Sequence, residues 1–235
     1  TPILNPHIAT KVQLLRPHFQ CSPQCPVPSQ AENRPGPALA VSPTVAAKIR
    51  HGKNISAVVT IKKLSYESKN VLVGNIKNPE HLVFCHMDSV GGVGACDNAS
   101  GVAVCLSTLI ENPALLTATL FVFAGCEERS YSKPVHWGHG YRVFQKRNIK
   151  LFTAARTVTV VDSGGIGKSV AYKDANLLNL AFPVVLPKNI QVTGIFGSYK
   201  KLMSVYHSAA DTPEKLDYTE ITRAVGLLLR SFSRH

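Results

Sequence analysis

Three apolar runs of the sequence each lead into side chains of the types that bind divalent cations. These side chains are His86 and Asp88 at the end of 81–87, Glu127 and Glu128 after 117–125, and Asp162 within 155–163. Imidazole and carboxylate groups are common zinc ligands. Several carboxylates cannot share one pocket in the ionised state unless cations lie among them. The pattern therefore predicts metal-dependent chemistry, in which a bound cation activates water and polarises a carbonyl group.

The three runs are rich in β-branched and aromatic residues, which is typical of buried strands. Asp97 lies just ahead of 101-GVAVCLSTLI-110, which we expect to form a helix that ends near Pro113. In an open parallel sheet, ligands bind at the carboxyl ends of the strands. Five of the 12 acidic residues in 70–235 are therefore expected to meet at this edge.

Strands and helices alternate over the rest of the chain. We expect further strands at 70–76, 169–173 and 181–186, a helix at 139–148, and an amphipathic helix at 218–232. This alternation predicts an α/β fold with a mostly parallel central sheet flanked by helices. Because neighbouring side chains on a strand point to opposite faces, Cys85 is expected to pack in the core while His86 faces the site.

Five separated motifs together resemble the M28 family of di-zinc aminopeptidases. They are 86-HMDS-89, 94-GACDNASG-101, 127-EE-128, 162-DSGG-165 and 206-YHSAADTPEKLD-217. The likeness covers roughly residues 70–235, and the motifs follow the family's order. The resemblance implies the three-layer zinc exopeptidase fold and an enzyme that removes N-terminal residues from peptides with a free N-terminus.

The resemblance also implies roles for individual residues. One zinc ion would be bound by His86 and Asp162, a second by Glu128 and His207, and both by Asp97. Glu127 would be the general base, Asp88 would hold the ring of His86, and Tyr206 would stabilise the oxyanion. Two Zn²⁺ ions are thus implied, and carboxylate-rich sites also accept Co²⁺ or Mn²⁺.

The sequence departs from the family after the glutamate pair. The family has a glycine- and leucine-rich run there, whereas this chain has 127-EERSYSKPVHWGHGYRVF-144. We expect His136, Trp137 and His139 to be residues of the pocket rim or of a loop. Because the pocket segments differ, a side-chain preference cannot be carried over from the family.

Three other functions remain open from the sequence. The same fold could act as a glutaminyl cyclase or a carboxypeptidase, or as a non-catalytic module that binds peptides. Separately, 162-DSGGIGKS-169 nearly matches a phosphate-binding P-loop. A P-loop requires a helix directly after it, whereas 169-SVAYK-173 is expected to be a strand.

Composition separates an N-terminal arm from the remainder of the 235 residues. The chain has 26 basic and 14 acidic residues, a net charge of +12. Residues 1–69 carry +7 of this charge and contain most of the prolines, so we expect a loop-rich basic arm. Its segment 39–73 resembles the end of a protease-associated insert, and 53–64 shows partial strand alternation. Residues 70–235 are expected to form the catalytic domain.

Partners and location follow from what the sequence contains. It holds no zinc finger, RNA-recognition motif or basic helix and no apolar run long enough to cross a bilayer, so we expect neither nucleic-acid nor membrane partners. Without a signal peptide, and with four cysteines in core-like segments, a reducing cytoplasmic location is expected. A disulfide between Cys21 and Cys25 stays open, and nothing indicates an oligomeric state. The missing initiator Met indicates a processed form or a fragment.

Overall fold

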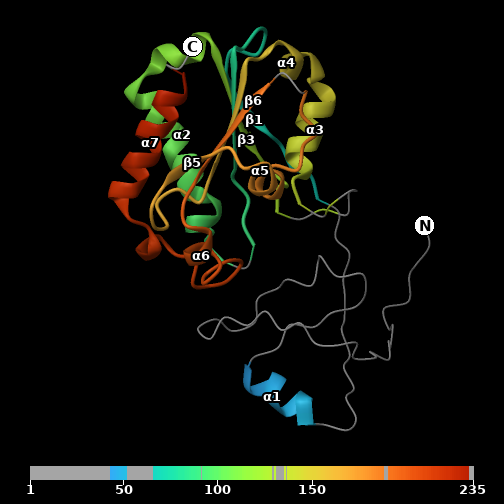
Figure 1. Cartoon of the computed structure of the whole chain (residues 1–235). Coiled ribbons are helices and arrows are strands. Elements are labelled where there is room, and N and C mark those ends of the chain that lie inside the picture. The colour runs from blue at the N-terminus through green and yellow to red at the C-terminus, as the bar shows by residue number, and fades with distance from the viewer. Residues whose placement is uncertain are drawn as a thin grey trace, which may run out of the picture.

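The computed structural model describes residues 43–51, 66–90, 92–128, 130, 135, 137–187 and 190–232. Its centre is a six-stranded sheet in the order β1-β3-β2-β4-β6-β5 (Figure 1). The strands are β1 (Val71–Gly74), β2 (His81–His86), β3 (Thr119–Ala124), β4 (Thr157–Asp162), β5 (Val170–Tyr172) and β6 (Gln191–Phe196).

The four central strands are parallel, and the two edge strands are antiparallel to their neighbours. β2 lies between β3 and β4, and β6 pairs with the other side of β4. In this register His86 pairs with Ala124, and Asp162 pairs with Phe196. The carboxyl ends of β2, β3 and β4 therefore lie at the same edge of the sheet, as the sequence predicted.

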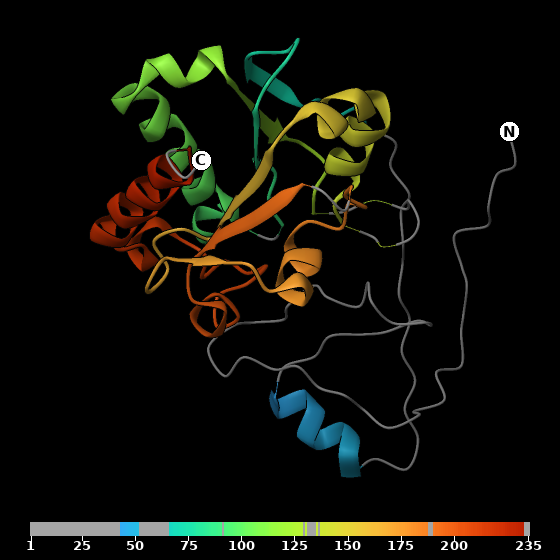
Figure 2. The same ribbon diagram turned by 45° about the horizontal axis from the view of Figure 1, so that its top comes forward.

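Helices cover both faces of the sheet (Figures 1 and 2). One face carries α2 (Ser100–Glu111) and α7 (Tyr218–Phe232). The other carries α3 (His139–Arg147), α4 (Ile149–Ala154) and α5 (Ala175–Ala181). Among the described residues, two further α-helices are α1 (Pro43–His51) and the single turn α6 (Tyr199–Leu202), and short 3-10 helices lie at Pro113–Thr117 and Pro213–Lys215.

The two faces have different cores. Under α2 and α7 most buried side chains are small or aliphatic, such as Cys85, Val104 and Leu228, and Phe121 and Phe123 add two aromatic rings. Cys85 thus packs in the core while its neighbour His86 lines a cavity, as expected. The opposite core is aromatic, and Phe84 lies at its centre in contact with the rings of Tyr141, Phe144, Phe152 and Phe182.

Most expected elements are present, with one strand misplaced. The expected strand at 181–186 is wrong, because α5 ends at Ala181 and the following residues form no strand. Pro183 lacks the N–H that a sheet interior requires. The strand instead lies at Gln191–Phe196, where Gly194 and polar residues hide the pattern. α4, α5 and α6 were not expected at all.

Two further predictions concern the N-terminal arm and the P-loop-like segment at 162–169. The arm lies outside the described residues except for 43–51 and 66–69, and so do the expected strand at 53–64 and both Cys21 and Cys25. Residues 170–172 form β5, so the helix that a P-loop needs is not there.

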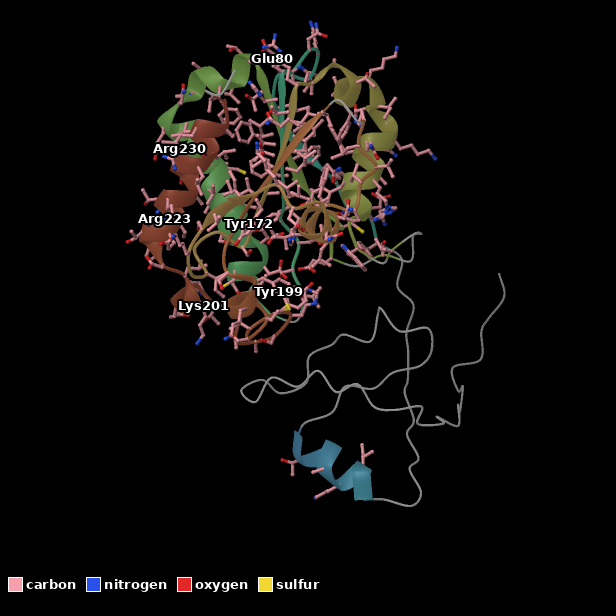
Figure 3. The ribbon with its side chains drawn as sticks, in the orientation of Figure 1. Glu80, Tyr172, Tyr199, Lys201, Arg223 and Arg230 are labelled. Carbon is pink, nitrogen blue, oxygen red and sulfur yellow. The ribbon has the colours of Figure 1, made fainter. Side chains whose placement is uncertain are left out.

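The two ends of the sheet differ in chemistry. Near the amino ends, Glu80 and Arg156 form an exposed ion pair of 3.2 Å. Figure 3 shows Glu80 at this end and Tyr199 at the opposite end, where the carboxyl ends of the central strands lie.

None of the helices in the described residues combines the length and apolar character that crossing a membrane would require.

Candidate metal centre

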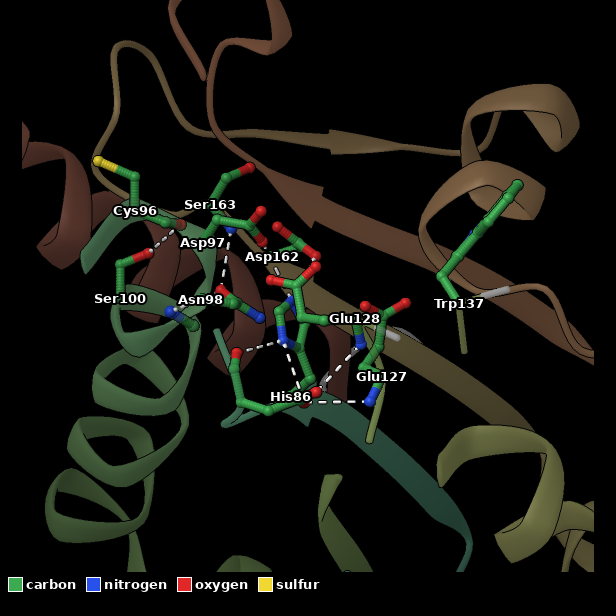
Figure 4. A network of polar contacts seen from close by, with 12 residues as sticks. His86, Cys96, Asp97, Asn98, Ser100, Glu127, Glu128, Trp137, Asp162 and Ser163 are labelled. Atoms are coloured by element: carbon green, nitrogen blue, oxygen red, sulfur yellow. Dashed lines mark hydrogen bonds and ion pairs between the residues drawn. The ribbon is translucent and has the colours of Figure 1, made fainter. Parts of the chain in front are cut away.

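The first group of predicted ligands lies at the ends of two adjacent parallel strands. His86 is the last residue of β2, and Asp162 is the last residue of β4. The Nε2 atom of His86 lies 3.6 Å from Oδ2 of Asp162 and 3.2 Å from Oδ1 of Asp97 (Figure 4). We call His86, Asp97 and Asp162 the strand triad, since two of its three members end strands.

The second group combines side chains from three loops. Glu128 follows β3, and His207 lies in the loop after α6. The Nε2 atom of His207 lies 2.6 Å from Oε2 of Glu128 and 3.4 Å from Oδ2 of Asp97. Asp97, Glu128 and His207 form what we call the loop triad, and Asp97 belongs to both triads.

The site is buried, although it opens into a cavity. The exposed fractions of His86, Asp97, Glu128 and His207 are all 5% or less. Glu127 is 7% exposed and lines the same cavity without belonging to either triad. The fold therefore brings together all five predicted metal ligands and places the predicted base beside them.

Asp88 contacts both the ring of His86 and the backbone of the glutamate pair. Its carboxylate oxygens accept hydrogen bonds from the backbone N–H groups of Glu127 (3.1 Å) and Glu128 (3.0 Å). The Nδ1 atom of His86 lies 3.1 Å from the backbone oxygen of Asp88, but 3.7 Å from its carboxylate. The backbone carbonyl thus orients the imidazole, and the carboxylate holds the glutamate pair.

Burial and neighbouring charges shift the pKa values of the carboxylates and imidazoles in the site. Burial and the neighbouring carboxylates raise the pKa of Glu127 well above its usual range. Burial also raises the pKa of Glu128, to about 7, and that of Asp162. Although burial opposes it, the carboxylates of Asp97 and Glu128 raise the pKa of His207 to about 9. The neighbouring carboxylates thus favour the protonated form of the His207 imidazole.

The donor set fits divalent cations. In the described part of the chain, Oε1 of Glu128 and Oδ2 of Asp97 are buried and accept no hydrogen bond. Buried oxygen atoms without a hydrogen-bond partner are rare in proteins unless an ion or a water molecule contacts them. Each triad brings one imidazole nitrogen and two carboxylate oxygens within 4.8 Å of one another. Three protein ligands with an open position are typical of catalytic zinc sites.

An apolar wall faces the charged groups across a cavity of about 250 Å³. The wall consists of Trp137, of Leu177 and Leu180 in α5, and of Phe196 at the end of β6. The indole N–H of Trp137 donates to the backbone oxygen of Leu180 at 2.9 Å, which fixes the ring against α5. Figure 4 shows Trp137 standing apart from the carboxylate cluster, beyond Glu127.

The residues expected at the rim fall in different places. Trp137 lines the cavity, whereas His139 begins α3 and is not among the lining residues. His136 lies outside the described residues. Tyr206 lines the cavity and stacks on the imidazole of His207, with 3.8 Å between the ring centroids.

Sequence reasoning missed two polar residues that join the ligand segments. The side chain of Asn98 donates to the backbone oxygen of Val161 and accepts from the N–H of Ser163, both at 3.0 Å, so it ties the Asp97 loop to the end of β4. The carboxylate of Asp211 accepts from the N–H groups of Cys96 and Asp97. Both residues occur within the quoted motifs, but residue type alone did not distinguish them from helix-capping and turn residues.

Known structures share this fold at low sequence identity. A Zn-dependent exopeptidase from Parabacteroides distasonis is 16% identical with a TM-score of 0.56, over 72% of this chain and 78% of that one. An aminopeptidase from Aneurinibacillus sp. strain AM-1 is 20% identical with a TM-score of 0.52, over 79% and 54%. A glutaminyl cyclase from Porphyromonas gingivalis is 14% identical with a TM-score of 0.53, over 76% and 79%.

At these identities the likeness concerns the fold, and the chain spans about half the length of the Aneurinibacillus aminopeptidase. A comparison with curated proteins gives no match. Residues 70–172 match the model of peptidase family M28. This segment contains four of the five motifs on which the resemblance was based. The resemblance is therefore confirmed for residues 70–172, which match the peptidase family M28, and the fold is one that a known Zn-dependent exopeptidase shares.

Proposed function

We propose that the chain is a metal-dependent aminopeptidase that removes residues from the free N-termini of peptides with two divalent cations, for which zinc is the favoured candidate. The observation that carries the proposal is the pair of triads joined at Asp97. One cation would be held by His86 and Asp162, the other by Glu128 and His207, and Asp97 would contact both. When bound, the cations supply Lewis acidity toward the scissile carbonyl and lower the pKa of water.

Glu127 is the proposed general base. It lines the cavity beside both triads and belongs to neither, so its carboxylate stays available for proton transfer. Glu127 accepts a proton from the attacking water and delivers it to the nitrogen of the leaving amine.

The other residues of the cavity account for substrate binding. The carboxylates of Glu127 and Asp162 offer negative charge for the α-ammonium group of a free N-terminus. The hydroxyl of Tyr206, beside His207, is suited to donate to the developing oxyanion. The wall formed by Trp137, Leu180 and Phe196 provides an apolar surface for the first side chain of the peptide.

A panel of substrates tests this proposal. The purified chain is loaded with Zn²⁺ and offered leucyl-arylamide, its N-acetylated counterpart, a peptide with an N-terminal glutamine, and a peptide with a free C-terminus and a blocked N-terminus. We expect the chain to hydrolyse leucyl-arylamide and to leave its N-acetylated counterpart intact. Cyclisation of the glutaminyl peptide without hydrolysis of the others would establish a glutaminyl cyclase instead. Cleavage only from the C-terminus would establish a carboxypeptidase.

A pair of glutamate variants tests the role of Glu127. Glu127→Gln is expected to retain the bound metal and lose about 10²–10⁴-fold in kcat, the usual contribution of a general base. Glu111→Gln, on the exposed side of α2, is the matched control and is expected to leave kcat unchanged. Wild-type turnover by Glu127→Gln would remove Glu127 from the mechanism. Absence of both metal and turnover in the wild-type chain would contradict the whole proposal.

A further inference from the structure

Asp211 is a buried carboxylate that contacts the backbone of Asp97, the residue that the two triads share. Its side chain is 2% exposed. Oδ1 accepts from the N–H of Cys96 at 2.6 Å, and Oδ2 accepts from the N–H of Asp97 at 3.1 Å. Both oxygens of one carboxylate thus engage two consecutive backbone amides, and the second of these amides belongs to the shared ligand.

The hydrogen bonds from these two amides compensate for the burial of the Asp211 carboxylate. Among the described residues, no ion pair involves Asp211. A buried carboxylate is costly unless it is paired or well hydrogen-bonded. Hydrogen bonds from N–H groups to a carboxylate are also shorter and stronger than bonds between neutral groups. The interaction is therefore a strong constraint on where the backbone of Asp97 lies.

Asp211 also belongs to the segment that carries the ligand His207, four residues earlier. The N–H of Asp211 donates to the backbone oxygen of Ser208 at 3.1 Å, which closes a turn between the two residues. The segment that contains Gly92 packs closely against this turn. A Cβ atom on Gly92 would lie only 2.6 Å from the backbone oxygen of Ser208. The position of His207 and that of Asp97 are thus coupled through a single turn.

Asp88 makes the same kind of contact on the other side of the centre. It follows the ligand His86 by two residues, and its carboxylate holds the consecutive amides of Glu127 and Glu128. Each aspartate therefore comes from a segment with a histidine ligand and clamps the backbone of a segment with a carboxylate ligand. This repeated geometry distinguishes Asp211 from an ordinary turn residue.

We infer that Asp211 is a positioning residue, which holds the carboxylate of Asp97 where both cations can share it. The inference rests on the proposed metal-dependent function, because it concerns how the ligands of those cations are placed. Asp211 lies behind the backbone of Asp97 and is not itself a ligand. Residues that orient ligands in this way contribute about 10–100-fold to metal affinity.

The variant Asp211→Asn tests this role. Asparagine has the same shape, but its NH₂ group would face one of the two backbone N–H groups and its charge would be absent. Asp217→Asn is the matched control, because Asp217 lies in the same segment and accepts from the N–H of Thr219 at 2.8 Å, away from both triads. Metal-free protein is titrated with Zn²⁺ against a chelator of known affinity, and the visible spectrum of the Co²⁺-loaded protein is recorded.

We expect the dissociation constant for Zn²⁺ to rise about 10–100-fold in Asp211→Asn and to stay within about twofold in Asp217→Asn. The Co²⁺ spectrum is expected to change only in the first variant, and kcat is expected to fall more than KM changes. If Asp211→Asn does not fold, Asp211→Ser is measured in the same way, since serine is smaller and cannot clash.

The outcomes separate this inference from the proposed function. A wild-type dissociation constant and Co²⁺ spectrum in a folded Asp211 variant would overturn the positioning role, even if the melting temperature fell. A wild-type chain that binds no Zn²⁺ and hydrolyses no free aminoacyl-arylamide would instead overturn the proposed function.

Discussion

The strand triad and the loop triad are built from similar side chains but rest on different supports. In the strand triad, His86 and Asp162 end two strands that are paired in a parallel ladder. In the loop triad, Glu128 and His207 lie in segments without regular structure. His207 itself has a φ of 51°, in the left-handed region that residues other than glycine seldom adopt.

The difference shows two ways of placing a ligand. A strand ladder fixes its terminal residues through backbone hydrogen bonds that every sequence can make. A loop needs side chains for the same purpose, and here Asp88 and Asp211 hold the segments of Glu128 and Asp97. Strained backbone persists only where the surroundings enforce it. The loop triad should therefore depend more on its neighbours than the strand triad does.

Removing the shared ligand should have the largest effect. Asp97→Ala takes one carboxylate from each triad, so we expect loss of both cations and a fall in kcat/KM of about 10³-fold or more, given that a supporting residue alone contributes about 10–100-fold. Metal analysis and steady-state kinetics measure this, with Glu111→Ala as a surface control. Retention of one tightly bound cation would mean that the triads do not share Asp97.

The two histidines should differ when each is removed. His207→Ala is expected to lose the cation of the loop triad and retain that of the strand triad, and His86→Ala is expected to do the reverse. Because the loops lack a ladder, we expect the loop cation to be the first one that a chelator removes from the wild-type chain. Zn²⁺ titration should then show two classes of site, and His207→Ala should lack the weaker class. If His207→Ala instead lacked the tighter class, the loop triad would be the tighter of the two sites.

The affinity of the loop triad should depend on pH. The pKa of His207 is raised to about 9 and that of Glu128 to about 7 without metal, so both groups carry protons that a cation must displace. Affinity for Zn²⁺ is therefore expected to rise with pH between 6 and 8, by about tenfold per pH unit for each displaced proton. Titrations in buffers of different ionisation enthalpy count the protons released. In His207→Ala we expect the Zn²⁺ affinity to depend less steeply on pH. An unchanged dependence would mean that the displaced protons come from other groups.

Changing the apolar wall should have the smallest effect, because it leaves both triads intact. Trp137→Ala removes an indole that is held against Leu180, and we expect KM for leucyl-arylamide to rise about tenfold as apolar contact is lost. The metal content and kcat should change little. A large drop in metal content would show instead that the wall supports the ligand loops.

Much of the fold was predictable because strand and helix patterns are local. The runs that became β2, β3 and β4 are short, mostly apolar and bounded by turn residues, and the apolar face of α7 recurs with helical spacing. β6 was missed because Gly194 and Thr193 dilute its pattern, while Val184 and Val185 made a neighbouring loop look like a strand. In both cases tertiary packing outweighed local propensity.

The side-chain types of the candidate site were predictable, whereas the residues that support them were not. His86 and Asp162 follow from the rule that parallel strands present their carboxyl ends together. His207 entered through the family resemblance, because no strand leads into it. Asp211 lies in the same motif as His207, but an aspartate before a threonine and a proline is ordinary in a turn. Only its distances to the N–H groups of Cys96 and Asp97 reveal what it holds.

The sequence by itself determined which side chains are available and at which strand ends they lie, since residue type and strand pattern are local properties. The tertiary structure decided that Asp97 belongs to two triads, that the carboxylate of Asp88 accepts from the glutamate backbone, and that α5 and Trp137 form the wall. These facts depend on atoms far apart in the chain meeting within hydrogen-bond distance. Such meetings arise from the packing of the whole sheet and its helices, which no local pattern encodes.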